Sequence, residues 1–169
     1  NFDKNWNVKT RAIRSGHKAS DELEHSEPIF ATSSFTFETA KDAADCFLGE
    51  KDGNIYTRFS NPTVESFQNR LASMEEGDCC VATASGMSAI AITCLALLGQ
   101  GDHILACKNI FGTTLNFFKN HLNRFGIESS IVDIDDISSW ESQIRKNPKI
   151  LFVETPSNPL TLMWDIKEL

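Results

Sequence analysis

Four short segments of the chain combine residue types that bind small anions and flat heterocycles. They are residues 54–63, 84–88, 109–114 and 154–159. In the first segment Tyr56 stands two residues before Arg58, and in an extended backbone both side chains point to the same side. A phenol beside a guanidinium can clamp a phosphate group, because the guanidinium presents several donors in one plane. A solvated turn before a helix explains the same residues, and the sequence leaves both interpretations open.

The second segment, Ser85-Gly86-Met87, lies between an apolar run and a predicted helix. A glycine there lets the backbone approach a ligand closely. The first N–H groups of a helix lack intrahelical partners and carry the positive end of the helix dipole, so this position suits a phosphate. Ser85 alone is equally explained as a simple helix cap. The segment has one glycine, and it therefore matches neither a dinucleotide fingerprint nor a Walker loop.

The third and fourth segments add an aromatic ring and a stiff polar loop. Phe111 stands at the mouth of a predicted crevice, where it could stack on a flat heterocycle or simply belong to the core. Pro156 and Pro159 bracket a polar pair directly after an apolar strand and leave Asn158 a fixed place to hydrogen-bond. A solvated turn is the alternative interpretation of this loop.

An alternation of apolar runs and helical patterns positions these segments. Strands are predicted at residues 79–83, 103–107, 127–132 and 150–153, and helices at residues 39–49, 61–77, 88–98, 113–125 and 137–146. This order predicts an α/β fold with a parallel sheet covered on both faces. Ligands of such sheets bind beyond the carboxyl ends of the strands, where three of the four segments fall. Residues 1–36 show little periodicity and are predicted to form an extended arm with turns.

The composition argues against several classes of function. The net charge of −7 argues against nucleic acid as a partner, because phosphate backbones require a basic surface. The longest apolar stretch, residues 90–98, is too short to span a bilayer, and residues 1–20 contain no apolar core, so a cytoplasmic protein without a membrane partner is predicted. The cysteines show no C-x-x-C spacing and the histidines form no cluster, so no metal site is predicted.

Five stretches occur in the order found in one enzyme family. They are residues 28–35, 56–63, 85–89, 111–114 and 154–159. Together they resemble the Cys/Met-metabolism enzymes that use pyridoxal 5'-phosphate (PLP), the cystathionine synthase and lyase family, over nearly the whole chain. The resemblance implies an α/β PLP-dependent transferase fold of type I, similar to aspartate aminotransferase. Residues 1–60 would then form an N-terminal arm and cofactor-clamp loop, and residues 61–169 the first part of the large PLP-binding α/β domain, which would be incomplete.

The resemblance assigns the phosphate end of the cofactor to five residues. Ser85, Gly86 and Met87 would lie at the phosphate, with Gly86 and Met87 offering their backbone N–H groups. Tyr56 and Arg58 would reach across a subunit interface to the phosphate of the neighbouring protomer. This arrangement implies a homo-oligomer, expected to be a dimer of dimers.

The other assignments concern the cofactor ring. Phe111 would stack on the ring, Asn158 would hydrogen-bond its 3-oxygen, and Glu154 would support Asn158 from beside it. The family usually has tyrosine at the position of Phe111, and phenylalanine keeps the stacking but loses a hydroxyl that could move protons. The branch similar to O-succinylhomoserine sulfhydrylase carries phenylalanine here, which favours that branch.

The lysine that forms the Schiff base in this family lies beyond the 154–159 loop, and none of the lysines here has its context. No catalytic residue is therefore predicted within the chain, which is expected to be an N-terminal part that is inactive alone. The whole enzyme would exchange the γ-ester group of an amino-acid substrate, O-succinyl- or O-acetylhomoserine, for sulfide and give homocysteine in methionine biosynthesis. Cystathionine γ-synthase and cystathionine β- or γ-lyase are alternatives within the family. A non-catalytic interaction module is the alternative from another class.

Overall fold

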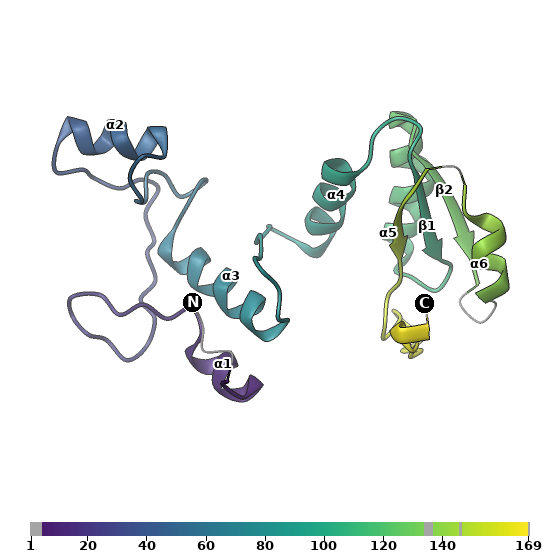
Figure 1. The fold of residues 1–169 in the computed structure, drawn as a ribbon, viewed down its shortest axis with the longest axis horizontal. Coiled ribbons are helices and arrows are strands. Elements are labelled where there is room, and N and C mark those ends of the chain that lie inside the picture. Colours follow the sequence, from purple (N-terminus) through teal and green to yellow (C-terminus); the bar gives the residue numbers. More distant parts are fainter. Residues whose placement is uncertain (1–4, 134–136, 146, 169) are drawn as a thin grey trace. The chain divides into compact units, whose positions relative to one another are not determined.

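The computed structural model describes residues 5–133, 137–145 and 147–168. The chain divides into two units, Asn1–Ala82 and Thr83–Leu169, which are described one after the other. Figure 1 shows helices joined by long loops in the first unit and a sheet with helices against it in the second. The predicted domain boundary between residues 60 and 61 differs from this division into compact units and stays a prediction.

The described part of the first unit contains three helices, α1 (Val8–Arg14), α2 (Ala40–Leu48) and α3 (Pro62–Met74). Both caps of α2 and the N-cap of α3 are those that the sequence predicts, whereas α3 ends at Met74 with Glu75 as its C-cap and not at Gly77. Thr39 accepts a hydrogen bond from the first turn of α2, and Gly49 ends this helix with a left-handed φ of 72°. Asn61 accepts a hydrogen bond from the Thr63 N–H at the start of α3.

Helix α1 lies within the stretch predicted to be an irregular arm, so this part of the prediction is wrong. Arg11 anchors it on the end of α3, because this 8% exposed side chain donates to the Ser73 carbonyl at 2.7 Å and to the Glu76 carboxylate at 3.0 Å. Gly16 follows with a φ of 81°, and a Cβ there would lie 2.3 Å from the carbonyl oxygen of Ser66. Tertiary packing on α3 therefore stabilises α1, which is too short to be stable by itself.

The arm packs against the polar side of α3. The buried residues of this helix are Ser66, Ala72 and Ser73. Its apolar stripe lies on the outside of the unit, with Val64 40% exposed, Phe67 55% and Leu71 37%. A stripe of this kind normally faces a core. Within the first unit, the buried side of α3 is therefore the polar one, and its apolar stripe is exposed.

The second unit has the predicted α/β architecture. Its described elements are α4 (Gly86–Leu97), β1 (His103–Cys107), α5 (Gly112–Asn116), a π turn (Phe117–His121), a 3-10 turn (Leu122–Phe125), β2 (Glu128–Val132), α6 (Ile137–Gln143), β3 (Pro148–Phe152) and a 3-10 helix (Ile166–Glu168). The strand order is β2-β1-β3, and both pairings are parallel. All five residues of β1 are buried, as expected of a central parallel strand. The predicted helix at residues 113–125 is helical but changes type twice.

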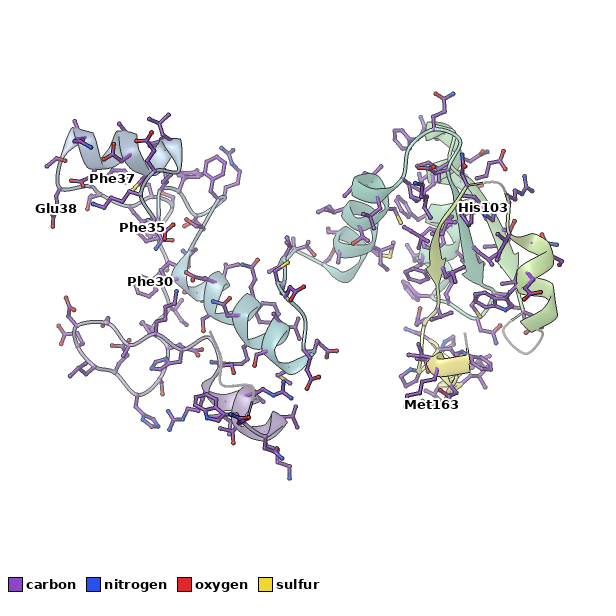
Figure 2. All side chains as sticks on the ribbon, in the orientation of Figure 1. Phe30, Phe35, Phe37, Glu38, His103 and Met163 are labelled. Atoms are coloured by element: carbon purple, nitrogen blue, oxygen red, sulfur yellow. The ribbon has the colours of Figure 1, made fainter. Side chains whose placement is uncertain are left out.

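The core of this unit lies between the sheet and the helices against it. Phe118 and Leu122 are fully buried, and the ring of Phe118 meets the ring of Phe152 edge-on at 5.0 Å between centroids. Trp140 of α6 is 5% exposed and donates its indole N–H to a backbone carbonyl at the end of β2. His103, labelled in Figure 2, lies at the amino end of β1 and is also buried.

The predicted strand at residues 79–83 is absent from the described structure. Val81 is 74% exposed, and the Ala82 N–H donates to the side-chain oxygen of Gln68 at 2.8 Å rather than to another strand. The apolar composition of this segment suits a buried strand, but a strand also needs a hydrogen-bonded neighbour. The described sheet therefore has three strands where four are predicted.

Helix α4 is apolar on every side, although much of its surface is exposed in this unit. Ile92 is 53% exposed, Leu95 52% and Leu97 61%, whereas Cys94 is buried. A helix that is apolar all round is typical of one enclosed by protein. With 12 residues α4 is too short for a bilayer, and in the described ranges no other helix has the length and apolar character to cross one.

Candidate functional site

The start of α4 presents two open backbone donors. Ser85 caps the helix, since its hydroxyl accepts from the Ser88 N–H at 3.1 Å. The N–H groups of Gly86 and Met87 have no hydrogen-bond partner among the described residues, and they lie at the positive end of a 12-residue helix. A Cβ on Gly86 would meet no atom within 4 Å. The local structure thus leaves an accessible pair of donors that suits a small anion.

The first turn of α5 lies beside both neighbouring segments. Phe111 stands at the N-cap position with its side chain 43% exposed, and its backbone N–H donates to the Glu154 carboxylate at 2.8 Å. Thr114 is 1% exposed, and its hydroxyl contacts the Met87 sulfur at 3.5 Å. Met87, Phe111 and Glu154 are therefore brought together. Phe111 and Glu154 follow the neighbouring strands β1 and β3, as expected of a ligand site at a parallel sheet, whereas the segment before Met87 forms no strand in the described structure.

A buried serine closes the loop after β3. Ser157 is 3% exposed, and its N–H donates to the Leu162 carbonyl at 2.9 Å while its hydroxyl accepts from the Leu162 N–H at 3.0 Å. The Thr161 N–H donates to the Ser157 carbonyl at 2.8 Å. The neighbouring Asn158 is exposed, and within the described ranges its side-chain amide has no partner. Sequence reasoning gave no role to Ser157, whose only signal is its place between two prolines.

In the first unit, Tyr56 and Arg58 form a cation–π pair. The guanidinium carbon of Arg58 lies 5.4 Å from the centre of the Tyr56 ring and 5.1 Å from that of Phe59. The predicted reason for their proximity is wrong, because the backbone turns after Tyr56, with the Phe59 N–H donating to the Tyr56 carbonyl at 2.8 Å. The turn, and not an extended strand, brings the phenol and the guanidinium together.

Asn61 holds the segment that carries this pair. It is 4% exposed, and its side-chain N–H₂ donates to the Phe30 carbonyl and to the Thr57 hydroxyl, each at 3.0 Å. The Thr57 N–H donates to the Ser33 carbonyl at 2.9 Å, and Ser34 and Tyr56 form an isolated antiparallel bridge. The sequence predicts Asn61 only as a helix cap, and the arm residues that it binds lie too far along the chain to be recognised.

The predicted site residues therefore form two groups, one in each unit. Tyr56 and Arg58 belong to the first unit, and the six others belong to the second. We call the first group, with the segment at residues 54–63, the clamp. We call the three segments around residues 85–87, 111–114 and 154–158 the loop cluster.

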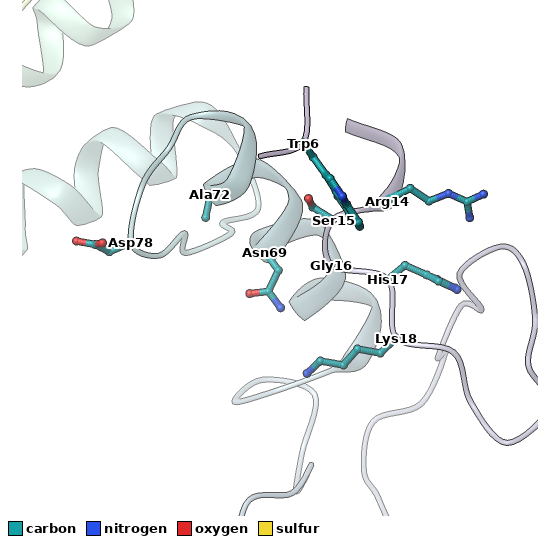
Figure 3. A pocket seen from close by; sticks show the side chains of 9 residues that line it. All are labelled: Trp6, Arg14, Ser15, Gly16, His17, Lys18, Asn69, Ala72 and Asp78. Carbon is teal, nitrogen blue, oxygen red and sulfur yellow. The ribbon is translucent and has the colours of Figure 1, made fainter. Parts of the chain in front are cut away.

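A cavity of about 290 Å³ lies between the arm and α3 in the first unit (Figure 3). It is lined by Trp6, Arg14, Ser15, Gly16, His17, Lys18, Asn69, Ala72 and Asp78, none of which is a predicted site residue. Its cationic side chains have other partners, since Lys18 pairs with Glu65 at 2.6 Å and Arg14 contacts His25 at 3.5 Å. Figure 3 shows Arg14 and Asp78 pointing to opposite sides. The cavity is a packing gap under the arm and has no cluster of free charges for a cofactor.

The cysteines divide between core and surface. Cys46, Cys94 and Cys107 are buried, as expected for core packing, whereas Cys79 is exposed and Cys80 half-buried. Burial raises the pKa of the Cys94 thiol, which keeps it protonated and unreactive. In the part of the chain that the structure covers, no group of three or more His, Cys, Asp or Glu side chains could hold a metal ion.

Curated proteins similar to this chain are enzymes that act on sulfur amino acids or their precursors. An O-succinylhomoserine sulfhydrylase from Pseudomonas aeruginosa is 45% identical over 160 residues, which are 95% of this chain and 40% of that protein. An L-methionine gamma-lyase from Fusobacterium nucleatum subsp. polymorphum is 36% identical over 166 residues, 98% of this chain and 42% of that protein. The chain thus spans about 40% of the length of these relatives.

A solved structure and a family description agree with these relatives. The crystal structure of a Campylobacter jejuni protein, assigned as an O-acetylhomoserine (thiol)-lyase, contains a pyridoxyl-lysine monophosphate group. It superposes with a TM-score of 0.89 at 35% identity and covers 97% of this chain, which spans 40% of its length. The description of the Cys/Met metabolism PLP-dependent enzymes matches residues 9–169. The fold of type I and the cofactor PLP follow from these matches, and the chain belongs to the Cys/Met metabolism PLP-dependent enzyme family.

Proposed function

We propose that the whole protein carrying this chain exchanges the γ-ester group of O-succinyl- or O-acetylhomoserine for sulfide and releases homocysteine. The observation that carries the proposal is the 45% identity to an O-succinylhomoserine sulfhydrylase over 95% of the chain. Phe111 supports it, because phenylalanine at this position resembles the sulfhydrylase branch. In this reaction sulfide forms the new bond to the γ carbon, and succinate or acetate leaves with the electrons of the broken C–O bond.

The start of α4 fits the phosphate of PLP. Gly86 and Met87 would donate their open N–H groups to it, and Ser85 keeps the helix start in place. Glycine at position 86 has no positive φ, and a Cβ there would touch nothing, so neither backbone strain nor packing in this unit accounts for it. A glycine at this position would let a ligand approach the backbone N–H groups closely, because glycine has no side chain.

The remaining residues of the loop cluster fit the ring. The exposed Phe111 side chain would stack on it, and the free amide of Asn158 would hydrogen-bond the 3-oxygen. Glu154 accepts from the Phe111 N–H and would support the ring side of the site. When bound, PLP supplies an electron sink for negative charge at the α carbon of the amino acid. The residues of this chain would bind and orient the cofactor, and the chain holds no candidate for the lysine that carries it.

The clamp fits the phosphate of a neighbouring protomer. Arg58 is exposed and, among the described residues, it pairs with no carboxylate, so its charge is available to an external anion. We propose that Tyr56 and Arg58 complete the phosphate site of an adjacent subunit in a cytoplasmic dimer of dimers. Light scattering on the whole protein tests this assembly. A protein that is a monomer in solution and still binds PLP would contradict it.

A γ-lyase is the second candidate, favoured by the methionine gamma-lyase that is 36% identical over 98% of the chain. The whole protein should be incubated with each homoserine ester plus sulfide and, separately, with methionine or cystathionine alone. Formation of homocysteine from an ester and sulfide is the expected result. Breakdown of methionine or cystathionine without ester turnover would favour the lyase, and a protein that binds no PLP would favour an interaction module.

A further inference from the structure

The first turn of α5 is bonded to both ends of the loop cluster. The Thr114 hydroxyl contacts the Met87 sulfur, in the segment proposed for the phosphate. The backbone N–H of Phe111 donates to Glu154, in the segment that carries Asn158. A single helical turn of four residues therefore lies between the phosphate end and the ring end of the proposed site.

The Thr114 hydroxyl is buried and links α5 to Met87 through a weak hydrogen bond. The side chain is 1% exposed, so its hydroxyl has no access to solvent and must find a partner within the protein. Its hydrogen-bond partner is the thioether of Met87, which is a weak acceptor. The bond fixes the side chain of the residue whose backbone N–H is one of the two open donors. Thr114 thus determines where that donor lies relative to α5.

The Glu154 carboxylate bonds the N-cap residue of α5. Phe111 occupies the N-cap position of α5, and no side-chain cap bond is made by this residue. Glu154 accepts from the Phe111 N–H at 2.8 Å from the end of β3, so the carboxylate stabilises the helix start from another segment. The same bond holds the backbone that carries the Phe111 ring.

We infer that Thr114 and Glu154 are positioning residues that make the first turn of α5 a rigid bridge between the phosphate donors and the stacking ring. The inference rests on the proposed function, since it assigns a role within that cofactor site. Neither side chain needs to touch the cofactor. Their effect is to fix the distance between the Met87 N–H and the Phe111 ring before the cofactor arrives, which lowers the ordering cost of binding.

The test measures cofactor affinity in the whole protein with two probes. PLP and pyridoxal, which lacks the phosphate, are titrated separately into the apo-protein, and the circular dichroism of the bound chromophore is recorded. Thr114→Val should weaken PLP about fivefold, as expected for one hydrogen bond, while pyridoxal affinity stays within about twofold. Glu154→Ala should weaken both probes about tenfold and change the dichroism, because the ring of Phe111 is displaced.

Conservative and distant variants serve as controls. Thr114→Ser keeps the hydroxyl and Glu154→Gln keeps an acceptor oxygen, so both should retain the wild-type affinities and dichroism. Glu128→Ala removes an exposed carboxylate that pairs with Arg145 at the amino end of β2, and it should leave both probes unaffected. If Thr114→Val does not fold, Thr114→Ala removes the same hydroxyl and takes its place.

A rigid bridge also predicts that the two ends are coupled. The double variant Thr114→Val/Glu154→Ala should lose less PLP affinity than the product of the two single losses. Either change alone releases one end of the bridge, so the distance between the Met87 N–H and the Phe111 ring is already no longer fixed. Independent losses, or single variants that bind both probes like the wild type, would overturn the inference. A wild-type protein that binds neither probe would instead contradict the proposed function, so the two failures are distinguishable.

Discussion

The loop cluster and the clamp satisfy their polar groups in different ways. In the loop cluster, separate segments bond to one another. The Phe111 backbone N–H donates to the Glu154 carboxylate, and the Thr114 hydroxyl donates to the Met87 sulfur. In the clamp, the guanidinium of Arg58 contacts two aromatic rings and, among the residues described, no acidic side chain. The loop cluster is bonded together within its unit and keeps the N–H groups of Gly86 and Met87 open, whereas the clamp presents a charge without a counter-ion among the described residues.

This difference separates positioning from binding. A buried hydrogen-bonded group contributes mainly to local order, because exposing or removing it leaves its partner unsatisfied. An exposed arginine that rests on aromatic rings is held in place while its donors stay free. Substitutions of the bonded groups in the loop cluster should therefore change geometry, and substitution of Arg58 in the clamp should change affinity for an anion with little effect on folding.

The largest effect is expected at Arg58. Arg58→Ala in the whole protein should raise the Kd for PLP about 50-fold, because charge-assisted hydrogen bonds to a phosphate are lost. The free energy of unfolding should change by less than about 0.5 kcal/mol, since the side chain is exposed. Cofactor titration and urea denaturation measure the two quantities. Arg58→Lys keeps the charge but not the planar donors, so its Kd for PLP should lie between those of the wild type and Arg58→Ala. An unchanged Kd for both variants would show that the clamp does not bind the phosphate.

Asn61 should show the opposite balance. Asn61→Ala removes the cap of α3 and two hydrogen bonds to the arm, so it should cost about 2 kcal/mol of local stability. Hydrogen exchange of the amides at residues 54–63 is the measurement. Asn61→Asp keeps the capping oxygen but loses the two donors, and its loss should be smaller. Unchanged protection of these amides in Asn61→Ala would show that the arm does not hold the clamp.

The pH dependence of stability probes the sheet through His103, at the amino end of β1. Burial lowers the pKa of His103, with a smaller contribution from the positive charge of Arg145, while Glu128 raises it. Because the unfolded chain takes up this proton first as the pH falls, stability is fully present above about pH 6.5 and is lost as the pH falls toward the pKa of the folded state. The slope for one proton does not exceed about 1.4 kcal/mol per pH unit.

Denaturation of the whole protein between pH 8 and pH 5 measures this slope. His103→Asn keeps a polar group near the Ser130 hydroxyl, to which His103 bonds at 3.0 Å, and it should flatten the pH dependence. An identical slope in wild type and His103→Asn would show that other groups carry the effect.

The smallest effect is expected at Ser157. Ser157→Ala removes the hydroxyl that accepts from the Leu162 N–H and should cost about 1 kcal/mol of local stability. Exchange of the Leu162 amide should become about fivefold faster, while the amides of the clamp keep their protection. Global loss of protection instead would mean that the loop is part of the cooperative core.

Elements with local signals could be predicted from the sequence. The caps at Thr39, Gly49 and Asn61 define the ends of α2 and the start of α3, because the signal lies within a few residues of the helix. Helix α1 was missed because Arg11 and Ser73, which anchor it, are 62 residues apart. The strand expected at residues 79–83 has the right composition but no hydrogen-bonded neighbour in the described structure.

The candidate site also divides into residues with a local signal in the sequence and residues that act through distant partners. Gly86 and Phe111 are visible from the sequence, because each stands where an apolar run is followed by a predicted helix. Thr114, Ser157 and the two donors of Asn61 act through partners in other segments, and no local pattern reveals such contacts. Residue type and spacing therefore identify the groups that we propose to meet a ligand, and the three-dimensional structure identifies the groups bonded to them.

A crystal structure of the whole protein with PLP bound tests the central claim most directly. The phosphate oxygens should lie about 3 Å from the backbone nitrogens of Gly86 and Met87, with the guanidinium of Arg58 from an adjacent protomer on the same phosphate. A phosphate held by other residues, with both N–H groups open to solvent, would contradict the account.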